Sequence, residues 1–189
     1  MNLSCVREIG EIKHGYTDLI VFPEGVSLGM FDEAASKYPN SIVVGAAEIN
    51  KNSVGLLFHM NQEKIRYSKV TSDSRTKGSD DISQCPVYDN KNACVGVLVC
   101  IDVDHVEFSN KVIEKVKSSD CDKRIICVPA DMGSFWFSNS NIGIKYRGVN
   151  VVLCNSDRTY KLGCQSFVTS TDGEKKIQAP DVLYTALPG

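Results

Sequence analysis

The sequence lacks the features that mark several common protein classes. It has three histidines, and none of its eight cysteines forms a Cys-x-x-Cys pair, so the spacing is poor for a closed zinc site. No run approaches the ~18 apolar residues of a membrane span, and residues 1–17 contain no apolar signal-peptide core. The formal net charge of -2 does not suggest a surface for nucleic acid or anionic membranes. We therefore expect a soluble, cytoplasmic protein.

The 189 residues are enough for one domain with a sizeable core, and no repeat, low-complexity tract or linker divides them. We expect a single domain over residues 1–189. Cys127 and Cys154 lie inside the apolar runs RIICVP and NVVLCN, where a free cysteine packs as a small hydrophobe. Most cysteines are therefore expected to be buried and reduced. A zinc or redox-switch function would rest on the number of cysteines alone.

Strand patterns and helix patterns alternate along the chain, which predicts an α/β fold with mixed sheets. Helices are expected at 30–38, 106–117 and 138–148. Strands are expected at 18–23, 41–49, 54–60, 63–69, 87–88, 95–99, 124–129, 150–155, 165–169, 175–178 and 182–187.

One stretch, TSDSRTKGSDDIS at residues 71–83, is polar and low in hydrophobicity. It fits a mobile surface loop, and it also fits a lid over neighbouring strand ends. The sequence leaves both interpretations open.

Three predicted strands end in a reactive side chain: DLIVFPE at Glu24, EKIRYSK at Lys69, and VGVLV just before Cys100. Open α/β sheets carry their chemistry at the carboxyl ends of strands, so these groups predict a common site. A free thiol of pKa ~8.5 needs a base or a cation beside it to act as a nucleophile. Glu24 would be the general base for Cys100, and Lys69 would stabilise an oxyanion with help from the backbone N–H of Ile101.

At these residues the chain resembles the carbon–nitrogen hydrolase, or nitrilase, superfamily. DLIVFPEG is similar to the segment with the family's catalytic glutamate, IRYSKV to its lysine segment and VGVLVCID to its nucleophile segment. The resemblance runs from about Asp18 to Leu187. It implies an α-β-β-α sandwich of nitrilase type with truncated N-terminal and C-terminal elements. The family usually pairs through its outer helices, which implies a homodimer or a higher homo-oligomer.

The resemblance also implies a function. Glu24, Lys69 and Cys100 would be base, oxyanion-stabilising lysine and nucleophile in a thiol-dependent hydrolase of non-peptide carbon–nitrogen bonds. The substrate would be a small amide, nitrile or carbamoyl compound, and no metal or organic cofactor would be used. Transferase members use the same three residues, and the sequence does not separate transfer from hydrolysis or identify the substrate.

Other positions support weaker hypotheses. Many family members carry a second glutamate between the lysine and the cysteine, where this chain has only aspartates: Asp73, Asp80, Asp81 and Asp89. That difference and the shortened N-terminus underlie the alternative of a catalytically weakened relative that binds a small molecule or a partner chain. Four residues after the strand at 124–129 are candidates for lining the pocket: Asp131, Met132, Phe135 and Trp136. Asp102 is expected at most to cap a turn, and His105 to be structural or solvated.

Overall fold

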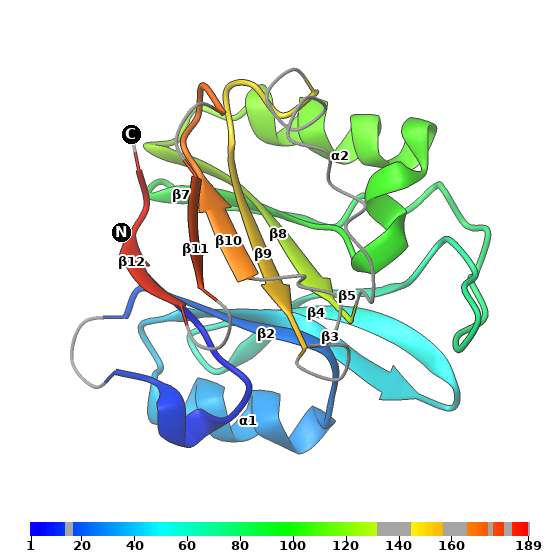
Figure 1. Cartoon of the computed structure of the whole chain (residues 1–189), viewed down its shortest axis with the longest axis horizontal. Coiled ribbons are helices and arrows are strands. Elements are labelled where there is room, and N and C mark those ends of the chain that lie inside the picture. Colours follow the sequence, from blue (N-terminus) through cyan, green and yellow to red (C-terminus); the bar gives the residue numbers. More distant parts are fainter. Residues whose placement is uncertain (14–16, 132–144, 157–165, 174–175, 180–182, 189) are drawn as a thin grey trace.

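The computed structural model describes residues 1–13, 17–131, 145–156, 166–173, 176–179 and 183–188. Two six-stranded sheets pack against each other, and within the described residues each sheet carries one α-helix on its outer face (Figure 1). The layers are therefore helix, sheet, sheet, helix. This is the α-β-β-α sandwich that the sequence predicts.

The first sheet has the strand order β12-β1-β2-β3-β4-β5. Its strands are β1 (Asn2–Cys5), β2 (Leu19–Val26), β3 (Ile42–Ile49), β4 (Asn52–His59), β5 (Gln62–Ser68) and β12 (Leu183–Ala186). β1, β2 and β3 are parallel, and β4 pairs antiparallel with both β3 and β5. Because two reversals restore the direction, β5 ends at the same edge of the sheet as β2. The elements that precede β2 are short, namely β1 and the 3-10 helix η1 (Ile9–Glu11).

The second sheet has the order β11-β10-β9-β8-β7-β6. Its strands are β6 (Val87–Asp89), β7 (Ala93–Val97), β8 (Lys123–Ala130), β9 (Asn150–Asn155), β10 (Ser166–Thr169) and β11 (Lys176–Ala179). β7, β8 and β9 are parallel and wholly or largely buried. Strands buried on both faces are continuously apolar, which explains the runs that identified them in the sequence.

The two helices close the outer faces of the sandwich. α1 (Leu28–Lys37) buries Phe31 at 0% exposure against the first sheet, a contribution of about 1.5–3 kcal/mol. α2 (Val106–Lys117) buries the face expected from its periodicity: Phe108, Val112, Ile113 and Val116. His105 caps this helix, since its Nδ1 accepts a hydrogen bond from the backbone N–H of Phe108 at 3.3 Å. The sequence predicted a structural or solvated histidine, and this cap is a structural contact.

The interior between the sheets is apolar and contains several free thiols, among them Cys5, Cys127 and Cys154. The sequence predicted this burial for most of the cysteines. Most of the helix expected at 138–148 lies outside the described residues. Over the part of the chain that the structure describes, no helix combines the length and the apolar character needed to cross a membrane.

Candidate active site

Glu24, Lys69 and Cys100 come together at the edge where the parallel strands of both sheets end. Lys69 Nζ lies 3.0 Å from Glu24 Oε1, and the Lys69 side chain is fully buried. Cys100 Sγ lies within 4.8 Å of a carboxylate oxygen of Glu24. The exposed fractions of Glu24 and Cys100 are 7% and 6%. The three candidates from the sequence thus share one buried site, although they are up to 76 positions apart in the chain.

The backbone around Glu24 is irregular, and that irregularity aims its side chain. The pairing of β2 with β3 shifts register between Val21 and Glu24 and again after Glu24. Pro23 lies inside this shift and offers no N–H to a neighbouring strand, which is where proline is tolerated in sheets. An extra residue of this kind re-aims the following side chain. Glu24 therefore turns toward Lys69 instead of keeping to the regular alternation.

The Lys69 ammonium donates to three oxygen atoms. They are Glu24 Oε1 at 3.0 Å, Asp73 Oδ2 at 2.5 Å and Thr76 Oγ1 at 3.4 Å. Burial on its own lowers the pKa of Lys69, but the acidic groups of Cys100, Glu24 and Asp73 outweigh burial and raise the pKa overall. The lysine is therefore a charged group held between two carboxylates.

Asp73 was not singled out as a site residue in the sequence. The loop over residues 71–83 brings it to the site, since Asp73 Oδ1 accepts from the backbone N–H groups of Arg75 and Thr76, both at 2.8 Å. Burial raises the pKa of Asp73, but the hydrogen bonds from Lys69 and from these amides lower it overall to about 2. The spacing Asp-x-Arg-Thr four residues after the lysine was the available signal, because an aspartate there can bond the backbone two and three residues on.

Cys100 lies at the first position of η2 (Cys100–Asp104) with φ of 50°. A residue with a side chain rarely adopts this left-handed conformation, and it costs of order 1–3 kcal/mol. Burial raises the pKa of the Cys100 thiol, and the charge of Glu24 raises it further while Lys69 opposes both, giving about 12. The thiol therefore carries its proton at neutral pH.

A buried network holds the turn after β7 against the end of β5. Tyr67 Oη accepts from the backbone N–H of Val99 at 2.5 Å and contacts Asp102 Oδ2 at 3.3 Å. Asp102 Oδ1 also accepts from the N–H groups of Val70 at 3.1 Å and Thr71 at 2.8 Å. Asp102 was expected to cap a local turn, but its partners lie about thirty residues away. It joins the lysine strand to the cysteine turn.

Asp131, a predicted pocket residue, lines a small cavity of about 50 Å³ beside Glu24. Its carboxylate forms an ion pair with Arg75 and accepts a hydrogen bond from Ser156 Oγ, and its carbonyl accepts from Arg75 at 2.7 Å. Ile101, the predicted second oxyanion donor, follows Cys100 within η2 and is half-buried. Met132, Phe135 and Trp136 lie outside the described residues.

A metal ion is the alternative occupant that this donor set permits. Glu24, Asp73 and Cys100 each offer one ligand atom, and these atoms lie within 4.8 Å of one another. However, Lys69 already donates to both carboxylates. A cation would have to displace the ammonium from between them.

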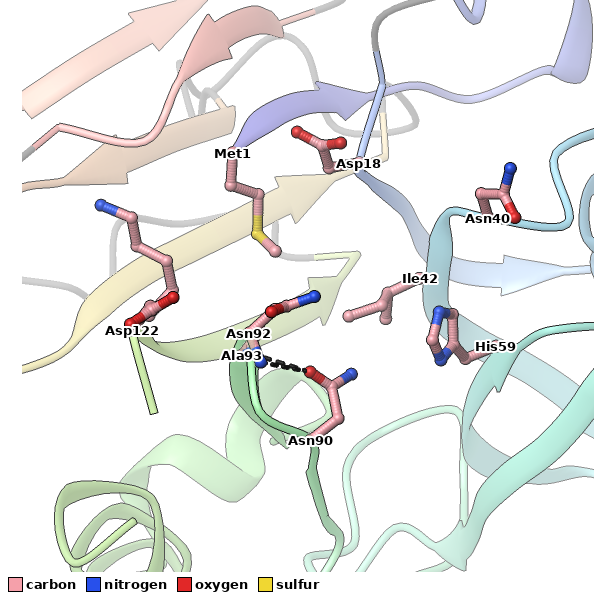
Figure 2. Close-up of a pocket in the computed structure, with 10 residues that line it drawn as sticks. Met1, Asp18, Asn40, Ile42, His59, Asn90, Asn92, Ala93 and Asp122 are labelled. Carbon is pink, nitrogen blue, oxygen red and sulfur yellow. Dashed lines mark hydrogen bonds between the residues drawn. The ribbon is translucent and has the colours of Figure 1, made fainter. Parts of the chain in front are cut away.

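A larger cavity, of about 330 Å³, lies at the opposite edge of the sandwich, where β2, β3, β7 and β8 begin. Asp18, Asn40, His59 and Asn92 are among its lining residues (Figure 2). The hydrogen bond drawn there runs from the backbone N–H of Ala93 to Asn90 Oδ1 and closes the turn before β7 (Figure 2). This cavity is remote from the three strand ends that carry Glu24, Lys69 and Cys100.

Neither the protein-family models nor the curated protein sequences give a match to this chain. Solved structures do. Nit3 from Saccharomyces cerevisiae, a member of branch 10 of the nitrilase superfamily, superposes with a TM-score of 0.68 at 14% identity, covering 100% of this chain and 90% of that chain. An amidase from Nesterenkonia sp. gives 0.64 at 15% identity, with coverages of 100% and 90%. XC1258 from Xanthomonas campestris, a CN-hydrolase superfamily protein with an arsenic adduct in its active site, gives 0.64 at 14% identity, with coverages of 97% and 89%. The chain therefore has the nitrilase-superfamily fold.

Proposed function

With that fold as the premise, we propose that the chain is a thiol-dependent hydrolase of non-peptide carbon–nitrogen bonds, and specifically an amidase. Cys100 is the nucleophile, Glu24 the general base and Lys69 the cation at the oxyanion. The observation that carries the proposal is the buried contact of a thiol, a carboxylate and an ammonium at the ends of three strands. Among the structural neighbours, variants of the Nesterenkonia amidase bind butyramide and add acrylamide at the active-site cysteine. That chemistry supports an amide as the substrate class.

The raised thiol pKa determines how the first step runs. Because the pKa of Cys100 is about 12, through burial and the charge of Glu24, the thiol must lose its proton as it attacks the carbonyl carbon. Glu24 Oε2 is buried and accepts no hydrogen bond from the described residues, so it is available to take that proton. Glu24 then passes the proton to the leaving nitrogen as the C–N bond breaks. Ammonia departs and an acyl thioester remains on Cys100.

Lys69 has three N–H donors, and all three are already engaged in the free protein. The contact to Thr76 at 3.4 Å is the longest, so it is the one exchanged for the developing oxyanion. A preorganised donor of this kind contributes about 2.7–4 kcal/mol to lowering the barrier. In the second half-reaction Glu24 takes a proton from water, which attacks the thioester. The acid product leaves and the thiol is restored.

Ammonia release from propionamide tests the proposal. Wild-type protein should release ammonia, whereas Cys100→Ala and Glu24→Gln should fall to the rate without protein. Cys85→Ala is the matched control, because Cys85 is an exposed cysteine outside the site, and it should retain the activity. Unchanged hydrolysis in Cys100→Ala would disprove the mechanism. No ammonia release by wild type from propionamide or from other small amides would favour a binding protein with the same fold.

A further inference from the structure

Two buried oxygens without hydrogen-bond partners among the described residues lie at the cavity beside Glu24. Glu48 and Ser53 face each other across β3 and β4, so their side chains point to the same side of the sheet. Ser53 is 1% exposed, and its Oγ has no hydrogen-bond partner among the described residues. The second unpartnered oxygen is Glu24 Oε2. Glu24 Oε2 takes the thiol proton in the proposed reaction, so Ser53 Oγ is the buried oxygen left for a ligand that brings its own donor, because an unmet polar atom is costly to bury.

The charges around this cavity are unequal. Three carboxylates line it, those of Glu24, Glu48 and Asp131, against one described cation, Arg75. Arg75 is committed to Asp131 through both its side-chain carboxylate and its carbonyl oxygen. The neighbouring Lys69 is likewise committed to two carboxylates. The described residues therefore give this cavity a surplus of negative charge that no protein cation balances.

We propose that this cavity selects amides that carry a cationic N–H group on the carbon next to the carbonyl. The inference rests on the proposed function, because the cavity adjoins the base of that reaction. A volume of about 50 Å³ accepts a group of ammonium size, since a cavity of about 10–15 Å³ already holds a water molecule. The ammonium donates to Ser53 Oγ and balances the charge of Glu48, and Glu24 Oε2 stays free to take the proton of Cys100. A neutral alkyl group leaves Ser53 Oγ without a hydrogen-bond donor, and a carboxylate is repelled.

Three small amides of similar size separate these cases: glycinamide is cationic, propionamide neutral and oxamate anionic. Rates of ammonia release are compared at least one pH unit below about 7.7, so that the glycinamide amine is protonated. We expect kcat/KM for glycinamide to exceed that for propionamide by at least about tenfold, as for hydrogen bonds to charged groups, with oxamate slowest. Equal or faster hydrolysis of propionamide would overturn the inference while leaving the amidase proposal intact.

Substitutions of the cavity residues test whether this cavity causes the preference for glycinamide. Glu48→Gln should lower the ratio of kcat/KM for glycinamide to that for propionamide by about two- to fivefold, a modest factor because Glu48 is exposed. Ser53→Ala should lower the ratio further. Glu33→Gln, an exposed carboxylate on α1, is the control and should leave the ratio as in wild type. A ratio unchanged by both cavity variants would contradict the assignment.

Binding measurements on a variant without the nucleophile test this inference independently of the proposed function. In Cys100→Ala protein, calorimetry should show tighter binding of glycinamide than of propionamide, and added salt should reduce the difference. If no amide is hydrolysed but this preference persists, the amidase proposal fails and the cavity assignment stands. If propionamide binds as tightly as glycinamide, the cavity assignment fails.

Discussion

The phenol of Tyr67 and the carboxylate of Asp102 meet in the interior at 3.3 Å, although Tyr67 lies on β5 of the first sheet, Asp102 lies in η2 beyond β7 of the second, and they are 35 residues apart. Burial, and next the charge of Asp102, raise the pKa of Tyr67 well above its usual value, so the phenol stays neutral and keeps its proton to donate. Through this pair the strand that leads to Lys69 is tied to the turn that carries Cys100. The geometry of the site depends on a network that contains none of its three reactive groups.

Removal of the Asp102 carboxylate should destabilise the protein. In Asp102→Ala the buried N–H groups of Val70 and Thr71 lose their acceptor, so we expect at least about 2 kcal/mol less free energy of unfolding. Urea denaturation at neutral pH measures this. Asp104→Ala, at an exposed position two residues away, should change it by no more than about 0.5 kcal/mol. Equal changes in the free energy of unfolding of the two variants would mean that the network contributes nothing to stability.

Gly55 provides the space for the Tyr67 ring. A Cβ at Gly55 would lie 2.7 Å from Tyr67 Cδ1, closer still to Cε1, and 3.0 Å from a methyl group of Val99. The ring cannot yield freely because its hydroxyl is bonded to Val99 and Asp102. Gly55→Ala should therefore cost about 1–3 kcal/mol of stability and lower amidase activity.

Gly29 in α1 is the matched control, since a Cβ there would meet nothing within 4 Å. Gly29→Ala should raise the free energy of unfolding by about 0.4–1 kcal/mol, because alanine restricts the unfolded chain. Urea titrations of both variants give the comparison. Tolerance of Gly55→Ala with full activity would show that the position of Tyr67 is not critical.

Asp73 should be a positioning residue for Lys69. Its pKa of about 2 results from the hydrogen bonds of Lys69 and two amides outweighing its burial, so it remains ionised at any pH used for assay. Asp73→Asn keeps an acceptor oxygen but removes the charge, and we expect kcat to fall about tenfold or more with a smaller change in KM. Asp81→Asn, exposed on the same loop, should leave kcat unchanged. A rise in KM of Asp73→Asn with kcat unchanged would contradict this role.

Buried thiols should limit stability at high pH. Burial raises the pKa of Cys100 from 9.0 to about 12 and that of Cys94 from 9.0 to about 11. Between the unfolded and folded pKa values only the unfolded chain releases these protons, so their contribution to stability is complete below about pH 9 and is lost as pH rises toward 12.

Each such thiol steepens the fall in the free energy of unfolding by at most about 1.4 kcal/mol per pH unit. The free energy of unfolding of Cys100→Ala should therefore fall less steeply above pH 9 than that of wild type. Urea titrations over a pH series measure both slopes, and changes in tyrosine and lysine ionisation are common to the two proteins. Parallel curves would mean that Cys100 is not held neutral by the fold.

The sequence predicted most of the strands and two of the helices because apolar runs and amphipathic spacing are local signals. It also predicted that Glu24, Lys69 and Cys100 share a site, since each follows an apolar strand and the three segments together resemble one family; the structure brings the three side chains together, and their catalytic roles stay a prediction. It did not predict that β12 pairs with β1, because strand pairing between the two ends of a chain has no local signature. The two layers of sheet came from the resemblance, and the structure confirms them.

The parts of the site that escaped prediction belong to loops. Whether residues 71–83 form a free surface loop or cover the strand ends depends on contacts with distant residues, such as Arg75 with Asp131 and Asp73 with Lys69. In the structure the loop covers the strand ends, and Thr76 is buried there. Asp102 looked like a turn cap because its partners are remote in sequence.

The most direct test of the account is the mass of the protein during turnover. Wild-type protein mixed with propionamide and quenched in acid should gain one propionyl group, and peptide mapping should locate it on Cys100 as a thioester that hydroxylamine removes. Glu24→Gln should show no such adduct. An adduct on another residue, or ammonia release from propionamide with none on Cys100 even under rapid quenching, would contradict the account.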